Sequence, residues 1–404
     1  MRRSAPLILV VLAAAVLGGS LALLGAKLTG LAGGGTTTVY VPRDARDLGA
    51  GLNEPVSASA RPLVGNGFDS ARIYTARSPG VVTVYAFFDK SDPHGAQGSG
   101  FVVSESGYIL TSAHVITDAG ETESAKTTEA SRVFIGFKDG DRAKAEIVGW
   151  DVYDDVALLR VSPEAHELSP VPLGDSSRVR AGDPVAAMGS PFGNEDSIAV
   201  GVVSAVRRSI MSLTSLYKVV DAIQIDAPIT HGNSGGPLFD ARGRVIGINA
   251  QIRTDSGTAE GVGFAIPINA AQRSMRQLAA VGHVVYAYLG VTTETLTPAL
   301  ARHLGFDTSR GAILSTVRDD SPADRAGLRG GSDAEMFNGE TISRGGDLIV
   351  AIDGQAVRSA DDVVRQVAAR LPGESASLTI VRDGERRVVR VRLGERPEAP
   401  ETSR

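Results

Sequence analysis

The sequence predicts a mostly β protein with two folded units behind an apolar N-terminal segment. From Arg72 to about Pro267, short apolar and β-branched runs alternate with turn residues, and no long helical pattern separates them. Many closely spaced strands of this kind are typical of a β-sandwich or barrel. Residues 283–395 mix strands with two short helical patterns and predict a second, smaller unit.

Composition excludes several classes of protein. The 404 residues are 43% hydrophobic and 22% charged, which is a globular rather than a disordered balance. A net charge of −5 favours neither nucleic acid nor an anionic membrane surface. There are no cysteines, so disulfides and thiolate metal ligands are excluded. The six histidines form no i,i+4 pair, and we expect neither a metal nor another cofactor.

The N-terminal segment has the length of a transmembrane helix. Leu7–Ala26 contains no charge and is flanked by Arg2, Arg3 and Lys27. At ~1.5 Å per residue it would span about 30 Å, the thickness of the bilayer core. A cleaved signal peptide is the alternative, but its apolar core would be shorter and would end at a small-x-small site. We expect residues 1–29 to be an anchor with its arginines in the cytoplasm and the rest of the chain outside.

The remaining chain divides by composition. Residues 30–69 are rich in Gly, Pro, Ser, Thr and Ala without periodicity, which indicates a flexible linker. The strand-rich unit covers 70–282 and closes with apolar residues at helical spacing over Ile268–Val281, which predict a helix linking the units. The second unit covers 283–395, and 396–404 is expected to be a disordered tail.

The most specific pattern is GNSGGP at Gly232–Pro237. Glycines around Ser234 let the backbone pass close to a substrate. A serine hydroxyl is a poor nucleophile at neutral pH, so it requires a base and an orienting acid. Upstream, TSAHV contains His114 at the end of a predicted strand, and DVYDDVALLRV contains three aspartates.

The three aspartates compete for the role of orienting acid. That acid should be buried enough to hold one tautomer of the imidazole. Asp155 directly precedes the apolar run VALLRV and is the preferred candidate, with Asp154 as the alternative and Asp151 more distant.

GNSGG also fits G-x-S-x-G, the nucleophile elbow of α/β-hydrolases. That fold needs a helix directly after the serine, and its acid and histidine come later in the chain. Here Ser234 is followed by a strand–turn–strand pattern, and His283 and His303 fall outside the strand-rich unit. An esterase of this type is therefore a weaker interpretation.

With TSAHV, DVALL and GNSGGP in this order, the chain resembles the HtrA/Deg family of trypsin-like serine proteases over roughly residues 70–395. The resemblance implies a chymotrypsin-like double β-barrel followed by a small α+β PDZ domain. It implies that His114 is the general base, Asp155 the orienting acid and Ser234 the nucleophile. The backbone N–H groups of Gly232 and Ser234 would form the oxyanion hole.

The resemblance also places the primary specificity pocket. Ile229 and Ile252 fall where the family builds that pocket, and two branched apolar side chains favour small aliphatic substrate residues such as Val or Ala. Asp226 is close enough in sequence to leave an acidic pocket floor open as an alternative. His231 can be a substrate contact or a partly exposed loop residue.

The second unit opens with YLGV at Tyr288–Val291. In the PDZ interpretation, Tyr288, Leu289, Gly290 and Val291 form a loop whose N–H groups bind a peptide C-terminus, while the peptide adds to the sheet as a strand. The alternative is an ordinary edge strand.

Local signals subdivide this unit further. Ser321-Pro322 and Ser359–Asp362 predict helix starts, and Asp383-Gly384 predicts a hairpin turn. Gly330–Gly345 is longer than a compact PDZ loop requires, and the sequence assigns it no function.

Together these patterns imply a membrane-anchored, extracytoplasmic serine endoprotease that degrades unfolded or damaged proteins without a cofactor. The PDZ domain would bind substrates or regulate cleavage, and the resemblance implies a homotrimer. A catalytically silent PDZ chaperone or scaffold is the alternative from another class. The complete set of His114, Asp155 and Ser234 argues against it, because a scaffold requires none of them.

Overall fold

The computed structural model describes eight segments of the chain: 67–89, 95–119, 127–190, 197–211, 214–215, 218–229, 232–250 and 262–397. The predicted membrane helix at 7–26, nearly all of the linker at 30–69 and most of the tail at 396–404 lie outside these segments. Within the described segments, no helix has the length and apolar character needed to cross a bilayer.

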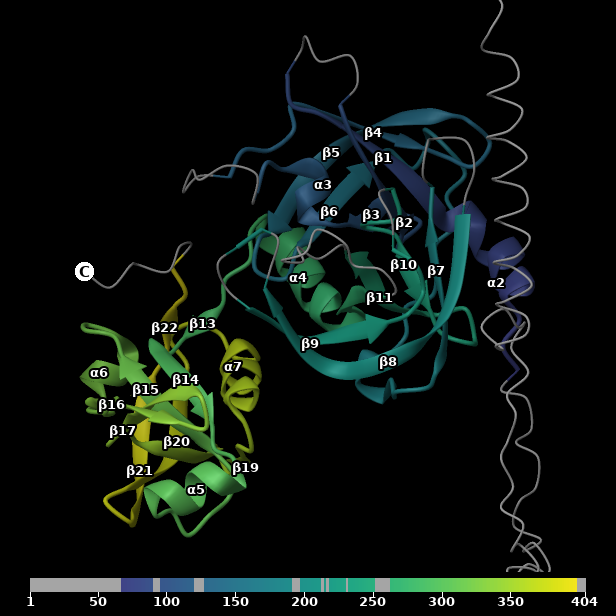
Figure 1. Cartoon of the computed structure of the whole chain (residues 1–404). Helices are drawn as coiled ribbons and strands as arrows, with labels where there is room; N and C mark the ends of the chain where they lie inside the picture. The colour runs from purple at the N-terminus through teal and green to yellow at the C-terminus, as the bar shows by residue number, and fades with distance from the viewer. Residues whose placement is uncertain are drawn as a thin grey trace, which may run out of the picture. The chain divides into compact units, whose positions relative to one another are not determined.

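Six antiparallel strands close the first barrel in the order β1-β2-β3-β6-β5-β4 (Figure 1). A short helix, α3, follows β3, and α2 with the 3-10 turn η1 precedes β1. The elements are α2 (Ser70–Arg77), η1 (Ser78–Gly80), β1 (Val81–Phe87), β2 (Ala96–Val102), β3 (Tyr108–Thr111), α3 (Ala113–Ile116), β4 (Arg132–Gly136), β5 (Arg142–Asp151) and β6 (Val156–Val161).

A second barrel of six strands follows, with the order β10-β11-β12-β9-β8-β7. A 3-10 turn, η2, precedes it, and the helix α4 begins directly where β12 ends. The elements are η2 (Ser176–Arg178), β7 (Pro184–Gly189), β8 (Ser197–Met211), β9 (Lys218–Ile225), β10 (Pro237–Phe239), β11 (Val245–Ala250), β12 (Gly263–Pro267) and α4 (Ile268–Val281).

One apolar cluster joins the two barrels. Phe101 and Leu158 contribute from the first barrel, and Met188 and Phe239 contribute from the second; all four are fully buried. Interiors pack at crystal-like density, so a shared cluster fixes the relative position of the elements that contribute to it. The strand-rich region is therefore a double β-barrel, which confirms the predicted fold class and excludes the α/β-hydrolase fold.

The predicted connecting helix is confirmed with its bounds. Helix α4 begins after Pro267 and ends at Gly282, which adopts a left-handed conformation and donates its N–H to Leu278 O. A glycine at this position is a common helix stop because it lacks a Cβ. The buried positions Ile268, Ala271 and Leu278 recur at helical spacing and belong to the cluster that joins the barrels.

The C-terminal unit is built on the sheet β14-β15-β18-β20-β21, with β19 paired to β18. β14 is the last strand on its side of this sheet, and helix α7 packs against it. The elements are β13 (Ala287–Tyr288), β14 (Val291–Thr295), α5 (Pro298–Leu304), β15 (Ala312–Val317), α6 (Pro322–Arg325), β16 (Asp333–Phe337), β17 (Glu340–Arg344), β18 (Leu348–Ile352), β19 (Gln355–Ala356), α7 (Ala360–Ala368), β20 (Ser375–Arg382), β21 (Glu385–Arg392) and β22 (Gly394–Glu395).

The predicted helix starts in this unit are confirmed. The Ser321 side chain accepts the N–H of Asp324 at the start of α6, and the Ser359 side chain accepts the N–H of Asp362 at the start of α7. Each serine satisfies an N–H group that has no partner within its helix.

The segment Gly330–Gly345 contains a structure that the sequence reading missed. It forms the two-stranded hairpin β16–β17, which turns at Asn338-Gly339, and both turn residues have positive φ angles. Asn-Gly is the commonest sequence for such a turn, so the signal was present. The predicted turn at Asp383-Gly384 has the same pair of positive φ angles and is confirmed.

We expect Leu278→Ala to lower the free energy of unfolding by about 2–5 kcal/mol, because it removes a side chain from the cluster that joins the barrels. Val281→Ala on the same helix is the matched control, since Val281 is 62% exposed and Leu278 only 1%. Urea unfolding measures both variants, and equal effects would contradict the packing described here.

Candidate active site

His114 lies in α3, directly after the end of β3. Its Nδ1 is 2.8 Å from Asp155 Oδ2, and its backbone N–H donates to Asp155 Oδ1 at 3.0 Å. The carboxylate therefore holds both the ring and the main chain of the same residue. The histidine side chain is 22% exposed and that of Asp155 is 4% exposed, so the ring edge remains accessible while the acid is covered.

Asp155 occupies the end of the turn that connects β5 to β6. Its φ angle is 52°, in the left-handed region that few non-glycine residues adopt. The pairing of Asp151 with Val156 closes the hairpin on either side of this turn. Aspartate tolerates this conformation better than most residues, and the turn directs its carboxylate to His114.

Ser234 comes from the second barrel, in the turn between β9 and β10. The first barrel contacts it directly, because Ser99 donates its N–H to Ser234 O at 2.9 Å. The next residue is held by β11, since Gly235 donates its N–H to Asn249 O at 2.9 Å. The hydroxyl Oγ of Ser234 is buried and makes no hydrogen bond to any residue that the structure describes.

The glycines of GNSGGP are required by close approach. Gly235 has a φ angle of 83°, and a Cβ there would lie 2.3 Å from Ser99 O and 2.9 Å from Ser112 N. Ser112 is two residues before His114, so the serine turn packs directly on the segment that carries the histidine. A side chain at Gly235 would push these segments apart.

Asp151 and Asp154, the other two aspartates of the motif, bind elsewhere. Both carboxylates contact the Tyr286 hydroxyl, and Arg273 and Ser274 of α4 donate to Asp154 and Asp151 respectively. Asp155, by contrast, bonds both the ring and the backbone N–H of His114. The geometry therefore favours Asp155 as the partner of the histidine.

This aspartate–tyrosine cluster was not found by sequence reasoning. Its members are brought together from the β5–β6 turn, from α4 and from the segment that follows α4. More than a hundred residues separate Asp151 from Tyr286. The sequence offered only Asp151, an aspartate without a role in any motif, as an indication of this cluster.

Of the residues expected to line the specificity pocket, only Ile229 is described. It is half-buried and packs against the core of the second barrel, close to Gly263 of β12. Ile252 and His231 lie outside the described residues. Asp226 accepts the N–H of Val202 at 2.6 Å, so its carboxylate is used to bind β8.

The segment Tyr288–Val291 crosses from β13 into β14. Leu289 O accepts the N–H of Ala323, and Gly290 O accepts the N–H of Arg318, both at 2.9 Å. In a planar trans peptide the N–H points opposite to the C=O. The N–H of Gly290 is therefore directed away from α6, and that of Val291 away from Arg318, which follows β15. Gly290 has a φ angle of 83°.

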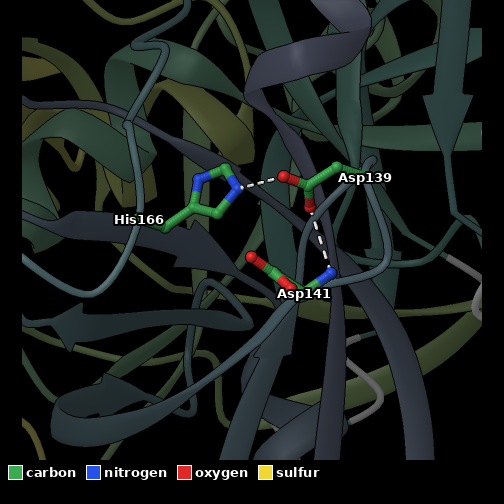
Figure 2. Close-up of side chains that lie close together, drawn as sticks. All are labelled: Asp139, Asp141 and His166. Atoms are coloured by element: carbon green, nitrogen blue, oxygen red, sulfur yellow. Dashed lines mark hydrogen bonds and ion pairs between the residues drawn. The ribbon is translucent and has the colours of Figure 1, made fainter.

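Three side chains of the first barrel could contact a metal ion: Asp139, Asp141 and His166 (Figure 2). His166 Nε2 is 2.8 Å from Asp139 Oδ2, and its Nδ1 is 2.8 Å from Glu167 O. Burial disfavours charge on the ring, but these two acceptors outweigh it and raise the pKa of His166. Both ring nitrogens of His166 are thus engaged by oxygen atoms of the protein, and we describe the cluster as a hydrogen-bonded His166–Asp139 pair.

Comparison with known proteins agrees with this architecture. Residues 98–248 match the family model of a trypsin-like peptidase domain, and residues 287–393 match that of a PDZ domain. The fold and its two matched domains define a trypsin-like peptidase domain followed by a PDZ domain.

A probable periplasmic serine endoprotease, DegP-like, of Halomonas elongata is 38% identical over 309 residues, which are 76% of this chain and 58% of the relative. Its counterpart in Ectopseudomonas mendocina is 37% identical over 324 residues, 77% of this chain and 62% of the relative. The chain thus spans about six tenths of the length of these curated relatives.

Solved structures match over a larger share of their length. The HtrA-type protease AlgW with tripeptide has a TM-score of 0.66 and 32% identity, covering 83% of this chain and 99% of that one. The serine endoprotease from Yersinia pestis has a TM-score of 0.57 and 27% identity, covering 81% and 98%. The chain belongs to the HtrA family of serine proteases.

Proposed function

We propose that this protein is an extracytoplasmic serine endoprotease in which His114, Asp155 and Ser234 are the catalytic triad. The observation that carries the proposal is the double contact of Asp155 with His114, beside a serine turn that the first barrel contacts directly. Unfolded or damaged proteins are the proposed substrates, and a homotrimer is the proposed assembly; both rest on the family.

The chemistry follows from the positions of these groups. Asp155 accepts a hydrogen bond from Nδ1 of His114, which leaves Nε2 as the base. Nε2 removes the proton of Ser234 as Oγ attacks the scissile carbonyl carbon, and a covalent acyl-enzyme forms when the amine leaves with that proton. Water then repeats the sequence and releases the acid. Ser234 Oγ makes no hydrogen bond to a described residue, and this is compatible with the role because catalytic hydrogen bonds can form or shorten in the complex with substrate.

The proposed oxyanion hole consists of the N–H groups of Gly232 and Ser234. Both N–H groups belong to the turn that Ser99 holds from the first barrel, through its bonds to Gly232 O and Ser234 O. One such donor contributes ~3–4 kcal/mol to the stability of the transition state. Ile229 and Ile252 are proposed to line an apolar pocket for small aliphatic side chains, and the use of Asp226 in binding β8 supports this preference.

We expect Ser234→Ala to abolish casein hydrolysis, with turnover falling on the order of 10⁶-fold, while melting temperature and oligomeric state stay unchanged. His114→Ala should lower turnover by a similar factor. Asp155→Asn should lower turnover about 10⁴-fold, because an amide at this position holds the imidazole of His114 in the wrong tautomer. Ser106→Ala, at an exposed serine of the first barrel, is the control.

Near wild-type proteolysis by purified Ser234→Ala would overturn the assignment. Loss of activity in Asp154→Asn together with full activity in Asp155→Asn would transfer the role of the acid to Asp154. Intact binding of unfolded protein without cleavage by any version of the chain would favour the chaperone alternative.

We propose that residues 7–26 anchor the protein with its catalytic domains outside the cytoplasm. The charge-free length and the position of Arg2 and Arg3 support this topology. We expect the mature protein to stay with the membrane fraction after carbonate extraction and to keep its original N-terminal region. Mass spectrometry of the mature N-terminus decides the question, since a new terminus between Gly25 and Ala32 would mean a cleaved signal.

The PDZ domain is proposed to bind peptide C-termini at Tyr288–Val291. The N–H groups of Gly290 and Val291 point away from the segments that bind the Leu289 and Gly290 carbonyls, which supports a carboxylate site. The edge strand β14 lies beside α7, which supports addition of a peptide strand to the sheet. Binding would alter cleavage at Ser234 only if the peptide favours the active arrangement over the resting one.

We expect peptides with apolar C-termini to bind at least tenfold more tightly than their amidated versions, because amidation removes the charge that the loop recognises. Titration measures binding, and a separate reporter substrate measures cleavage. Equal binding of acid and amide would refute the carboxylate site. Selective binding without any change in reporter cleavage would make the PDZ domain a tether rather than a regulator.

A further inference from the structure

A buried carboxyl group closes the turn that carries Asp155. Asp151 stands at the end of β5 and is 1% exposed. Its Oδ1 accepts the N–H groups of Tyr153 and Asp154 at 2.9 and 3.3 Å, so one oxygen holds the first half of the turn. Its Oδ2 accepts the hydroxyl of Ser274 in α4 at 2.6 Å.

Asp151 Oδ2 also shares a proton with the hydroxyl of Tyr286. The hydroxyl oxygen of Tyr286 lies 2.5 Å from Asp151 Oδ2 and 2.8 Å from Asp154 Oδ2. A phenol carries one proton, and two carboxylates can share it only in a three-centre bond, which is weaker at each acceptor than a full hydrogen bond. Two separate hydrogen bonds form at these distances when one carboxyl group carries a second proton. That proton also removes the repulsion between two ionised carboxylates.

The surrounding charges indicate which carboxyl holds the proton. Arg273 donates to Asp154 Oδ2 at 3.2 Å, so its guanidinium forms an ion pair with Asp154. Burial, together with the charge on Asp154, raises the pKa of Asp151 to about 6 despite the hydrogen bonds from Ser274 and Tyr286. Below about pH 6 the shared proton therefore resides on Asp151.

The other groups around the pair leave this assignment unchanged. Burial keeps the pKa of Tyr286 well above its usual range, so the phenol remains protonated. The Arg396 guanidinium lies 4.9 Å from the centre of the Tyr286 ring and 5.2 Å from that of Tyr153. Asp155 is engaged with His114.

We propose that Asp151, in its protonated form, is a positioning residue that holds the turn carrying Asp155 through Tyr153, Asp154 and Tyr286. The inference deepens the proposed function, on which it rests. The turn needs external support because Asp155 has a positive φ angle. Thr214 of the β8–β9 connection adds to that support by donating to Val152 O in the same turn. When Asp151 ionises, it can no longer donate a proton to Tyr286. The contact that joins the turn to the segment after α4 then weakens.

Tyr286 gives this turn a connection toward the PDZ domain. It precedes β13 directly and is two residues from Tyr288, the first residue of the proposed carboxylate loop. The phenol therefore joins the turn of the catalytic acid to the chain segment that enters the PDZ domain.

The test compares Asp151→Asn, which reproduces the neutral form, with Asp151→Ala, which removes the group. Glu146→Gln, at an exposed carboxylate on the same strand, is the control. With a peptide reporter and the full-length protein, we expect Asp151→Asn to have a kcat within threefold of wild type at pH 5.5. The ratio of its kcat to the wild-type value should rise at least threefold by pH 8, because only wild type ionises there. Asp151→Ala should lower kcat at least tenfold with KM changed less than twofold.

A second readout does not depend on catalysis. The pKa of Asp151 is near 4 in the unfolded chain and about 6 in the folded protein. Protonation of Asp151 therefore stabilises folded wild type fully below pH 4, and this contribution is lost as pH rises through about 6. Asp151→Asn has no such ionisation, so its melting temperature relative to wild type should increase from pH 4 to pH 7, whereas Glu146→Gln should show no trend.

Each outcome decides one point. A kcat ratio and a melting-temperature difference that are both independent of pH would refute proton sharing. A melting-temperature trend with a constant kcat ratio would confirm the proton pair but refute its positioning role. A melting-temperature trend in a protein whose wild type and Glu146→Gln never cleave the reporter would refute the proposed protease function and leave the proton pair standing. Because Asp151→Ala can fail to fold, Asp151→Asn carries the decision.

Discussion

The contact between Ser99 and the serine turn is the constraint on which the site depends. Ser99 belongs to the first barrel, and its N–H donates to Ser234 O at 2.9 Å. Its hydroxyl donates to Gly232 O and accepts the N–H of Ser190. One residue therefore ties the first barrel to both ends of the Gly232–Ser234 segment. His114 and Asp155 come from that same barrel, so their distance to Ser234 is set by how the two barrels pack.

That packing explains the residue types around the site. The shared apolar cluster needs large side chains such as Phe101 and Phe239, whereas the polar contact zone needs glycine. At Gly235 a Cβ would reach the carbonyl oxygen of Ser99, and at Gly236 a Cβ would lie 2.2 Å from Met188 O. The GNSGGP pattern has glycine at Gly235 and Gly236 because backbone segments lie too close there for a Cβ. The same approach covers Ser234, which is 6% exposed.

Sequence reasoning was strong where chemistry is local and weak where it is not. The helix α4, the caps Ser321 and Ser359, and the turn at Asp383-Gly384 were all predictable, because each follows from neighbours a few residues apart. The pairing of Asp155 with His114 was accessible only through the order of the motifs. The hairpin at Asn338-Gly339 had a local signal that was overlooked. The Asp151–Tyr286 contact had none, because burial and proton sharing arise from the folded arrangement of distant segments.

Nucleophile competence is the central claim, and active-site labelling tests it most directly. The full-length protein in detergent is incubated with a fluorophosphonate, with and without an unfolded protein, and analysed by mass spectrometry. A phosphonylated Ser234 in wild type, absent in His114→Ala, is the predicted result, because only a serine activated by its base reacts rapidly. An increase in labelling on addition of unfolded protein would show that substrate completes the site. Failure of wild type to label under either condition, or equal labelling of His114→Ala, would contradict the account.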